Sequence, residues 1–204
     1  MTKQEEYITW LRRFSREILG ARIGDEETEL LWEGYFDELK ARGLHGVKMV
    51  ISDGHLVIIQ AVQHSVTDAA WQLCRVHFMR NLLNTMGKEH WSEVSYEMNA
   101  ATNNPESVTA FRVSLLFLGL QKATDMLDRC HDSLFNRTAF PRQYWRRLRI
   151  MNLLECINLE LKMRACNIGA FPGEQSLPRL AVSILMDINE EWLTGRKYLS
   201  LEDN

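Results

Sequence analysis

An acidic turn interrupts an apolar part of the chain and is the first group of residues that could do chemistry. The stretch "VKMVIS", residues 47–52, ends in Asp53-Gly54-His55, and a second apolar stretch begins at Leu56. A carboxylate that follows a buried strand occupies the position where α/β sheets place their sites, and it could bind a metal ion there. Asp53 could equally form a turn or cap the next helix, because short polar side chains commonly do both. Both interpretations remain open from these residues alone.

A second carboxylate, Glu155, lies on a segment that reads as a helix over residues 152–165. Its apolar stripe comprises Leu154, Ile157 and Leu161, and its polar stripe comprises Asn152, Glu155 and Asn158. Residues at these spacings share one helical face. The polar stripe is either a solvated face or a carboxylate directed into a site between two amides.

Cys74 and His77 lie three residues apart, a spacing that half of a zinc site could use. The chain has four cysteines, without a CxxC pair, and no second pair of ligands follows at zinc-finger spacing. We therefore favour a packed thiol and a hydrogen-bonded imidazole over a zinc site. Cysteines without a disulfide framework agree with a reducing compartment.

Two segments combine arginine with aromatic residues: "RVHFMRN", residues 75–81, and "RQYWRRLR", residues 142–149. This mixture suits phosphate contacts and base stacking. The alternative for the second segment is a helix with a solvated arginine side and a buried aromatic side. Its solvated residues would be Arg142, Arg146, Arg147 and Arg149, and its buried residues would be Tyr144, Trp145 and Leu148.

The composition predicts an ordinary globular protein. The 204 residues are 46% hydrophobic and 25% charged, with a formal net charge of −3 and a pI of about 6.1. This balance argues against disorder, and the acidic excess argues against a dedicated nucleic-acid-binding domain. No signal peptide opens the chain and no apolar run approaches about 18 residues, so we expect a cytoplasmic protein without a membrane span.

Hydrophobic periodicity predicts a small α/β unit that is interrupted by a helical block. Helices are expected over residues 25–43, 55–64, 152–165 and 175–193, and strands over 17–24, 46–52 and about 69–73, the last turning into a helix. The block from about 84 to 150 reads as helical throughout, with one helix over 105–127, and residues 171–173 read as a turn. Residues 1–16 read as a polar lead-in.

Several long segments together resemble the Mutator-like transposases of bacterial insertion sequences. They are "ARGLHGVKMVISDGH", "WQLCRVHFMRNLL", "FPRQYWRRLRIMNLLECINLELKMR", "IGAFP" and "EEWLTGRKYLS", in the family's order and approximate spacing. The resemblance runs from about Arg16 to Ser200.

The resemblance implies a helix-rich α/β fold, a partial ribonuclease-H-like core of the Asp-Asp-Glu type with a large helical insertion. Asp53 then corresponds to the second catalytic acid and Glu155 to the last, and both would bind the two Mg²⁺ (or Mn²⁺) ions that the family implies. Cys74 and His77 match a Cys-x-x-His signature of the family, with a role in local architecture or DNA handling. We expect DNA contacts from Arg75, His77, Arg80, Asn81, Asn152, Asn158 and Arg164.

The expected organisation has four parts. They are a divergent lead-in (1–15), a partial core with Asp53 (16–83), a helical insertion (84–148), and a returning core helix with Glu155 followed by C-terminal helices (149–204). Expected partners are DNA, as element ends and target, and a second copy of the chain or a full-length transposase, near the bacterial nucleoid. The alternative is a non-catalytic regulator that binds DNA or a transposase.

Three departures from the family pattern concern the catalytic site. The resemblance places the first acid upstream of "REILGARIG", and residues 1–15 do not match that strand. Ile150 and Met151 stand where the family has two threonines, and Cys156 stands where it has arginine after the glutamate. We therefore expect a copy truncated at its N-terminus, with an incomplete metal site and no activity on its own.

Overall fold

The computed structural model describes residues 18–20, 28–149, 152–168 and 176–194. The chain divides into two compact units. The core unit is Glu26–Asn152, and the terminal unit combines Met1–Asp25 with Leu153–Asn204. Each unit is described by itself.

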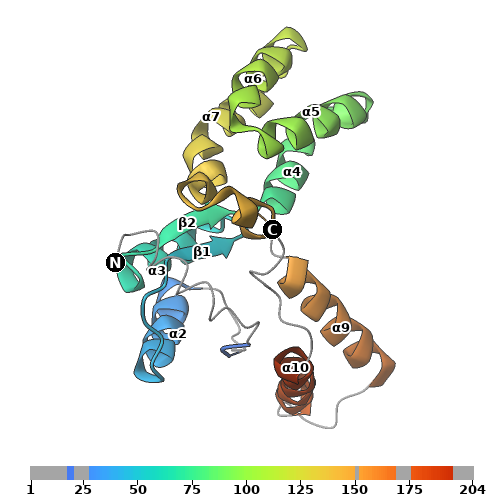
Figure 1. The fold of residues 1–204 in the computed structure, drawn as a ribbon. Coiled ribbons are helices and arrows are strands. Elements are labelled where there is room, and N and C mark those ends of the chain that lie inside the picture. Colours follow the sequence, from blue (N-terminus) through green and yellow to red (C-terminus); the bar gives the residue numbers. More distant parts are fainter. Residues whose placement is uncertain (1–17, 21–27, 150–151, 169–175, 195–204) are drawn as a thin grey trace. The chain divides into compact units, whose positions relative to one another are not determined.

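The core unit is helix-rich and contains a small parallel sheet (Figure 1). Its elements are α2 (Glu29–Ala41), β1 (Met49–Ser52), α3 (Leu56–Ser65), β2 (Ala70–Leu73), α4 (Arg75–Leu83), η1 (Lys88–His90), α5 (Trp91–Asn103), η2 (Pro105–Ser107), α6 (Val108–Phe117), α7 (Gln121–Phe135), η3 (Asn136–Ala139), η4 (Arg142–Tyr144) and α8 (Trp145–Leu148), where η denotes a 3-10 turn. The expected helix-rich α/β class is confirmed at this level.

The two described strands run parallel, and their register pairs Met49 with Ala70 and Ser52 with Leu73. Parallel neighbours need a crossover connection, and α3 supplies it. The first strand is shorter than the expected 46–52, whereas the expected change from strand to helix after Leu73 is confirmed. In parallel strands the carboxyl ends lie at one edge of the sheet, so the residues after Ser52 and Leu73 meet there.

Two apolar clusters hold the core unit together. One joins α2 and α3 through Phe36, Ile58 and Val62, with Val50 and Trp71 of the strands packed against them. The other fills the bundle of α4 to α7 and begins at Leu73; it includes Phe78, Leu82, Met98, Phe111, Leu115, Leu127 and Leu134. Trp71 contacts both clusters. Figure 1 shows α2 and α3 near the sheet and the bundle extending from it.

Two side-chain amides, one of them fully buried, tie the helical bundle to β2. The Gln72 side chain is fully buried; its Nε2 donates to Leu134 O at 2.8 Å, and its Oε1 accepts from Arg137 N at 2.9 Å. Asn136 Nδ2 donates to Trp71 O at 2.6 Å. The Gln72 side chain and Trp71 O, both of β2, thus find their hydrogen-bond partners in the helical bundle.

One expected helix is wrong. Residues 105–127 were expected to form a single helix, but the structure divides them among η2, α6 and α7. Gly119 has a φ of 71°, in the left-handed region that glycine tolerates, and this residue ends α6. Helical periodicity continues on both sides of the break, which is why the sequence pattern concealed it.

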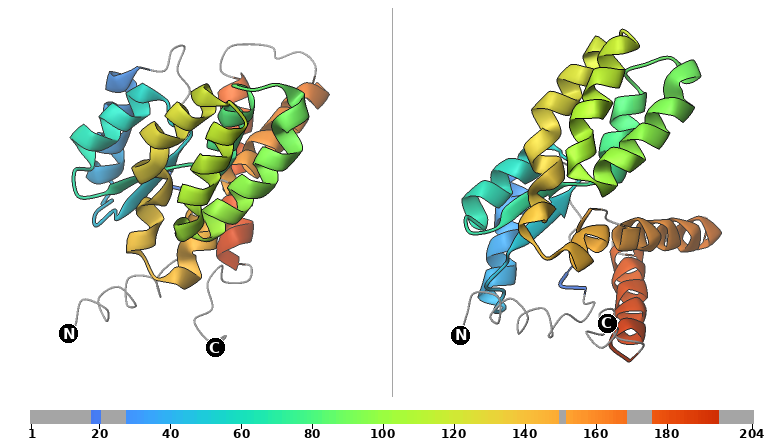
Figure 2. Two further views of the ribbon diagram at one scale, coloured as in Figure 1. Left: turned by 90° about the horizontal axis from the view of Figure 1, so that it is seen from above. Right: turned by 45° about the horizontal axis from the view of Figure 1, so that its top comes forward.

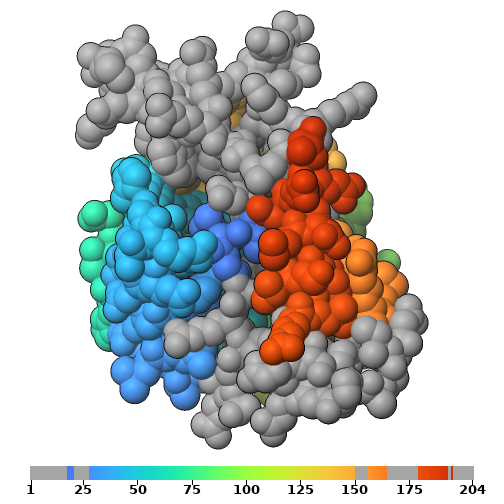
Figure 3. Space-filling model, turned by 90° about the horizontal axis from the view of Figure 1, so that it is seen from below, coloured from blue at the N-terminus to red at the C-terminus, as the bar shows by residue number. Residues whose placement is uncertain are grey.

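The terminal unit contains α9 (Asn152–Ile168) and α10 (Ser176–Thr194). Figure 2 gives two further views of these helices, and Figure 3 shows one face of α10 in red. Ile157 and Ile184 are buried, and Asn189 Oδ1 accepts a hydrogen bond from Ile18 N at 2.7 Å. Residues 18–20 are not part of a strand, against the strand expected over 17–24. The rest of that range, the lead-in 1–16 and the turn 171–173 lie outside the described residues.

None of the described helices has both the length and the apolar character that crossing a membrane requires.

Candidate functional site

Asp53 is the first residue after β1 and lies at the carboxyl edge of the sheet. Its carboxylate is exposed, and Oδ1 accepts a hydrogen bond from His55 N at 3.2 Å. This bond closes an Asx turn in front of α3, whose N-cap is His55. The turn role expected for Asp53 is therefore confirmed, although the second oxygen, Oδ2, stays available to another ligand.

The backbone after Ser52 can adopt this turn because Gly54 has no side chain. Gly54 has a φ of 91°, and a Cβ atom there would lie 2.7 Å from Leu73 Cδ1. Ser52 Oγ accepts hydrogen bonds from Trp71 Nε1 at 2.9 Å and from Gly54 N at 3.4 Å. The position of the Asp53 carboxylate thus depends on close packing between the two strand ends.

The corresponding residue after β2 is Cys74, which caps the start of α4. Cys74 is fully buried with a free thiol, and its N–H donates to Ser52 O at 2.8 Å. The packed thiol is therefore confirmed. We expected a hydrogen-bonded imidazole at His77; its Nδ1 is buried and has no hydrogen-bond partner among the described residues.

The exposed carboxylate of Asp53 is a suitable ligand for a hard divalent cation. Mg²⁺ and Mn²⁺ prefer carboxylate oxygens, and Asp53 offers them at an exposed strand end. No ion pair joins Asp53 to a basic side chain within the described ranges. Its negative charge is therefore not already neutralised by a neighbouring cation of those ranges.

Glu155 belongs to α9 in the terminal unit, and its side chain lies outside the described residues. The same holds for the side chain of Asn152. Asn158 and Arg164 are exposed on α9, and Arg164 is bonded to Glu160 at 2.6 Å. The convergence of Glu155 with Asp53 stays a prediction, as do the DNA contacts of Asn152, Asn158 and Arg164.

The other expected DNA contacts lie on α4. Arg80 and Asn81 are exposed, whereas Arg75 and His77 are partly buried. The Arg75 guanidinium donates to Asn99 Oδ1 on α5, and Arg75 N donates to Arg149 O at 2.8 Å. Arg75 therefore connects the end of β2 to the second arginine-rich segment, a proximity that their separation in the sequence did not reveal.

Arg137 joins this basic region from the interior and was missed by sequence reasoning. Only 1% of its surface is exposed, and the acceptors of its guanidinium among the described residues are carbonyl oxygens, Leu134 O and, at 2.5 Å, Thr102 O. Burial, together with the positive charges of Arg149 and Arg75, lowers the pKa of Arg137 to about 10. A lone arginine in "FNRTAF" carries no pattern that could have identified it.

A group of two carboxylates and a histidine joins α2 and α3. Within the described part of the chain, Glu29, Glu33 and His64 form a group whose possible metal-ligand atoms lie within 4.8 Å of one another. His64 Nδ1 already lies 2.9 Å and 3.0 Å from the two carboxylates, so the three side chains satisfy each other across α2 and α3. This group is separate in sequence from every acid that we expected to be catalytic.

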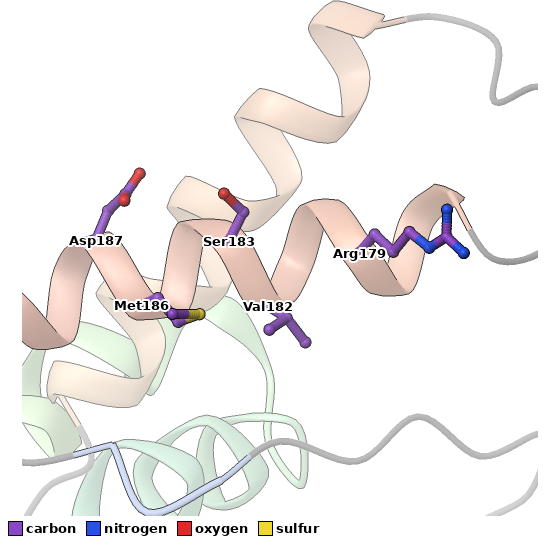
Figure 4. Close-up of a pocket in the computed structure, with 5 residues that line it drawn as sticks. All are labelled: Arg179, Val182, Ser183, Met186 and Asp187. Carbon is purple, nitrogen blue, oxygen red and sulfur yellow. The ribbon is translucent and has the colours of Figure 1, made fainter.

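A hollow of about 430 Å³ lies along α10. The described residues that line it are Arg179, Val182, Ser183, Met186 and Asp187, which recur at helical spacing and are shown in Figure 4. Val182 and Met186 are 50% and 67% exposed. The hollow has both apolar and polar side chains of one helix on its surface. The described residues that line it do not form a group of catalytic side chains.

Comparison with known proteins decides the family. The sequence model described as "Transposase, Mutator family" matches residues 12–195. This chain belongs to the Mutator family of transposases. The match includes the strand end with Asp53, the helical bundle and the helix with Glu155, so the resemblance read from the sequence motifs is confirmed.

Individual relatives agree with this assignment. The chain is 36% identical over 192 residues to the transposase for insertion sequence element IS1081 of Mycobacterium tuberculosis, which covers 92% of this chain and 46% of that protein. It is 32% identical over 195 residues to the transposase for insertion sequence element IS256 in transposon Tn4001 of Staphylococcus aureus, covering 92% and 50%. The chain thus spans about half the length of the curated relatives that it matches.

Proposed function

We propose that this chain supplies part of the catalytic core of an insertion-sequence transposase, with a ribonuclease-H-like arrangement of acids. The single observation that supports it most is the exposed Asp53 carboxylate at the carboxyl end of β1, beside the parallel strand β2. The family match supports DNA strand cleavage and joining as the reaction class. In this proposal the bundle of α5 to α8 is the helical insertion between the acids.

Asp53 and Glu155 would hold divalent cations in this site. When bound, such ions lower the pKa of the attacking water or hydroxyl and stabilise the leaving oxygen in an in-line displacement at phosphorus. Asp53 contributes a carboxylate whose direction is set by its bond to His55 N and by the turn at Gly54. Glu155 would contribute the second carboxylate from α9.

The proposal assigns two carboxylates of a three-carboxylate site to this chain. We therefore expect the purified chain to bind Mn²⁺ weakly and not to cleave element-end DNA by itself. Asp53→Asn should weaken Mn²⁺ binding about tenfold, because it removes a charged ligand oxygen. Titration calorimetry with Mn²⁺ measures this, and a plasmid-nicking assay measures cleavage.

Asp68→Asn is the matched control. Asp68 is an exposed acid that precedes β2, at the amino end of the same sheet. It should leave Mn²⁺ affinity unchanged. Equal affinities for wild type, Asp53→Asn and Glu155→Gln would show that these acids do not form the metal site, and efficient nicking that requires Asp53 would show that the site is complete.

A regulatory role is the second candidate, and one observation favours it. Arg75, Arg137 and Arg149 form a basic region without carboxylate partners among the described residues. This region does not include the acids that cleavage needs, so a chain that does not cleave DNA would still bind it. Such a chain would occupy element ends or associate with an intact transposase. A pull-down with a full-length relative, with and without DNA, would separate the two roles.

A further inference from the structure

A basic hollow lies in the core unit where the end of α5 meets the last residues of that unit. Its volume is about 180 Å³, well above the roughly 10–15 Å³ that one water molecule needs. Four arginines, Arg137, Arg142, Arg146 and Arg149, line it together with Trp145 and the last two residues of α5. We call this hollow the arginine pocket.

The positive charge of the arginine pocket is not neutralised by neighbouring acids. None of its four arginines forms an ion pair with a carboxylate of the described residues. The pKa of Arg149 is lowered by burial and by the charges of Arg75 and Arg146, which shows that like charges are held close together. Such an arrangement is unfavourable unless an anion enters it.

Unused hydrogen-bond donors accompany this charge. The Nε atoms of Arg75, Arg137 and Arg149 are buried and have no partner among the described residues. Neutral oxygens position these side chains instead: Asn103 Oδ1 accepts from Arg149, and Thr102 O accepts from Arg137 at 2.5 Å. Arg142 and Arg146 line the pocket and are exposed. The guanidinium groups are therefore partly fixed before any ligand arrives.

Trp145 gives the arginine pocket an aromatic wall. Its Nε1 donates to Phe140 O at 2.7 Å, and the Arg142 guanidinium lies 5.9 Å from its ring centroid. Arginine pairs well with phosphate because its planar donors match two oxygens. Aromatic surface beside such donors is typical of proteins that bind nucleic acid, where bases stack near the bound backbone. A nucleic-acid phosphate fits this combination better than a protein carboxylate.

The arginine pocket is connected directly to the edge of the sheet that carries Asp53. Arg149 O accepts from Arg75 N at 2.8 Å, and Ser52 O accepts from Cys74 N at 2.8 Å. From strand spacing and the distance between consecutive Cα atoms, the backbone of Arg75 lies roughly 10 Å from that of Asp53. A strand of DNA in the pocket would therefore have another phosphate near Asp53, because phosphates of one strand recur every few ångströms.

We propose that the arginine pocket binds a backbone phosphate of DNA and so positions the strand beside the acidic turn at Asp53. The pocket as an anion site follows from its own residues, whereas DNA as the source of the phosphate rests on the proposed transposase function. The pocket adds Arg137, Arg142, Arg146 and Arg149 to the residues that contact DNA.

The test is DNA binding by the whole chain in EDTA, which makes it independent of metal ions. Fluorescence anisotropy would measure the affinity for a labelled element-end duplex between about 50 and 200 mM salt, because the slope of log K against log salt counts neutralised phosphates. Arg142→Ala/Arg146→Ala should weaken binding about tenfold or more and reduce the slope by about 1 to 2. Both side chains are exposed, so a thermal melt should show the wild-type transition.

Arg129→Ala/Arg147→Ala is the matched control, because it removes the same charge from exposed positions that do not line the pocket. Its effect should stay below about threefold if only screened, long-range attraction is lost. A second variant, Arg142→Lys/Arg146→Lys, keeps the charge and should preserve the salt slope while losing affinity, since lysine lacks the bidentate geometry.

The outcomes separate this proposal from the catalytic one. In EDTA, Asp53→Asn should bind DNA at least as tightly as the wild type does, because it removes a negative charge near the strand, whatever its Mn²⁺ affinity. Wild-type DNA affinity and slope in Arg142→Ala/Arg146→Ala would overturn the pocket proposal. A thermal melt with added inorganic phosphate tests the anion site by itself. If phosphate stabilises the wild type but not Arg142→Ala/Arg146→Ala, and both bind DNA equally, then the pocket binds an anion other than a DNA phosphate and the proposal fails.

Discussion

Replacing Gln72 by leucine tests whether the helical bundle is held to the sheet by hydrogen bonds rather than by apolar packing alone. Gln72 is fully buried; Nε2 donates to Leu73 O at 3.0 Å and Leu134 O at 2.8 Å, and Oε1 accepts from Arg137 N at 2.9 Å. Leucine has a similar volume, so the variant removes the polar bonds while nearly filling the space.

The magnitude follows from which groups lose their partners. Leu134 O keeps the Arg137 guanidinium as a donor, but Arg137 N loses its acceptor in a buried place. An unsatisfied buried N–H costs about 1–3 kcal/mol, and each of the two lost Nε2 bonds costs about 0.5–1.5 kcal/mol. The added apolar surface offsets about 1 kcal/mol of this. We expect Gln72→Leu to lower the free energy of unfolding by about 1–5 kcal/mol.

Urea denaturation gives the total effect, and hydrogen exchange gives its location. The amide of Arg137 should exchange faster in Gln72→Leu, because its acceptor is gone, while amides inside α3 keep their protection. Gln63→Leu, at an exposed position of α3, is the control and should change stability by less than about 0.5 kcal/mol. Equal urea midpoints for the two variants, with unchanged exchange at Arg137, would refute the anchoring role of Gln72.

Two further substitutions test the local geometry of the core unit. Gly54→Ala should destabilise the chain by about 2–5 kcal/mol, from a left-handed backbone and overlap with Leu73. Gly43→Ala, at a φ of 102° with open space around it, should cost only the backbone part, about 1–2 kcal/mol, and equal losses in urea titrations would exclude the overlap. His64→Ala should cost less than about 1 kcal/mol because its pair with Glu33 is exposed, and a larger loss would mean that the pair fixes α2 on α3.

Much of the local structure could be predicted from the sequence. The apolar run before Asp53 and the acid-rich start of α2 indicated a strand and a helix in the right places, because periodicity and capping depend on neighbouring residues only. The break at Gly119 was missed because the periodic pattern continues across it, and a single glycine inside such a pattern does not fix the backbone angle.

The candidate site was predictable in part. Asp53 was recognised because a carboxylate after an apolar strand and before a glycine is itself a local pattern, and the segments that resemble the Mutator family supported the choice. The arginines near positions 75 and 142–149 were noticed, but their meeting was not. Arg149 O accepts a hydrogen bond from Arg75 N, and no periodicity connects two segments that are separated by α5, α6 and α7.

The sequence by itself determined the family and the strand that precedes Asp53, because each depends on residue types in fixed order. Only the tertiary structure decided that Arg137 is buried, that it joins Arg149 around one hollow, and that Gln72 and Asn136 fasten the bundle to β2. The reason is physical: whether a charge or an amide lies in water or inside the protein depends on which distant segments pack over it. A polar residue that stands out by no pattern in the sequence can therefore become a buried part of the packed structure.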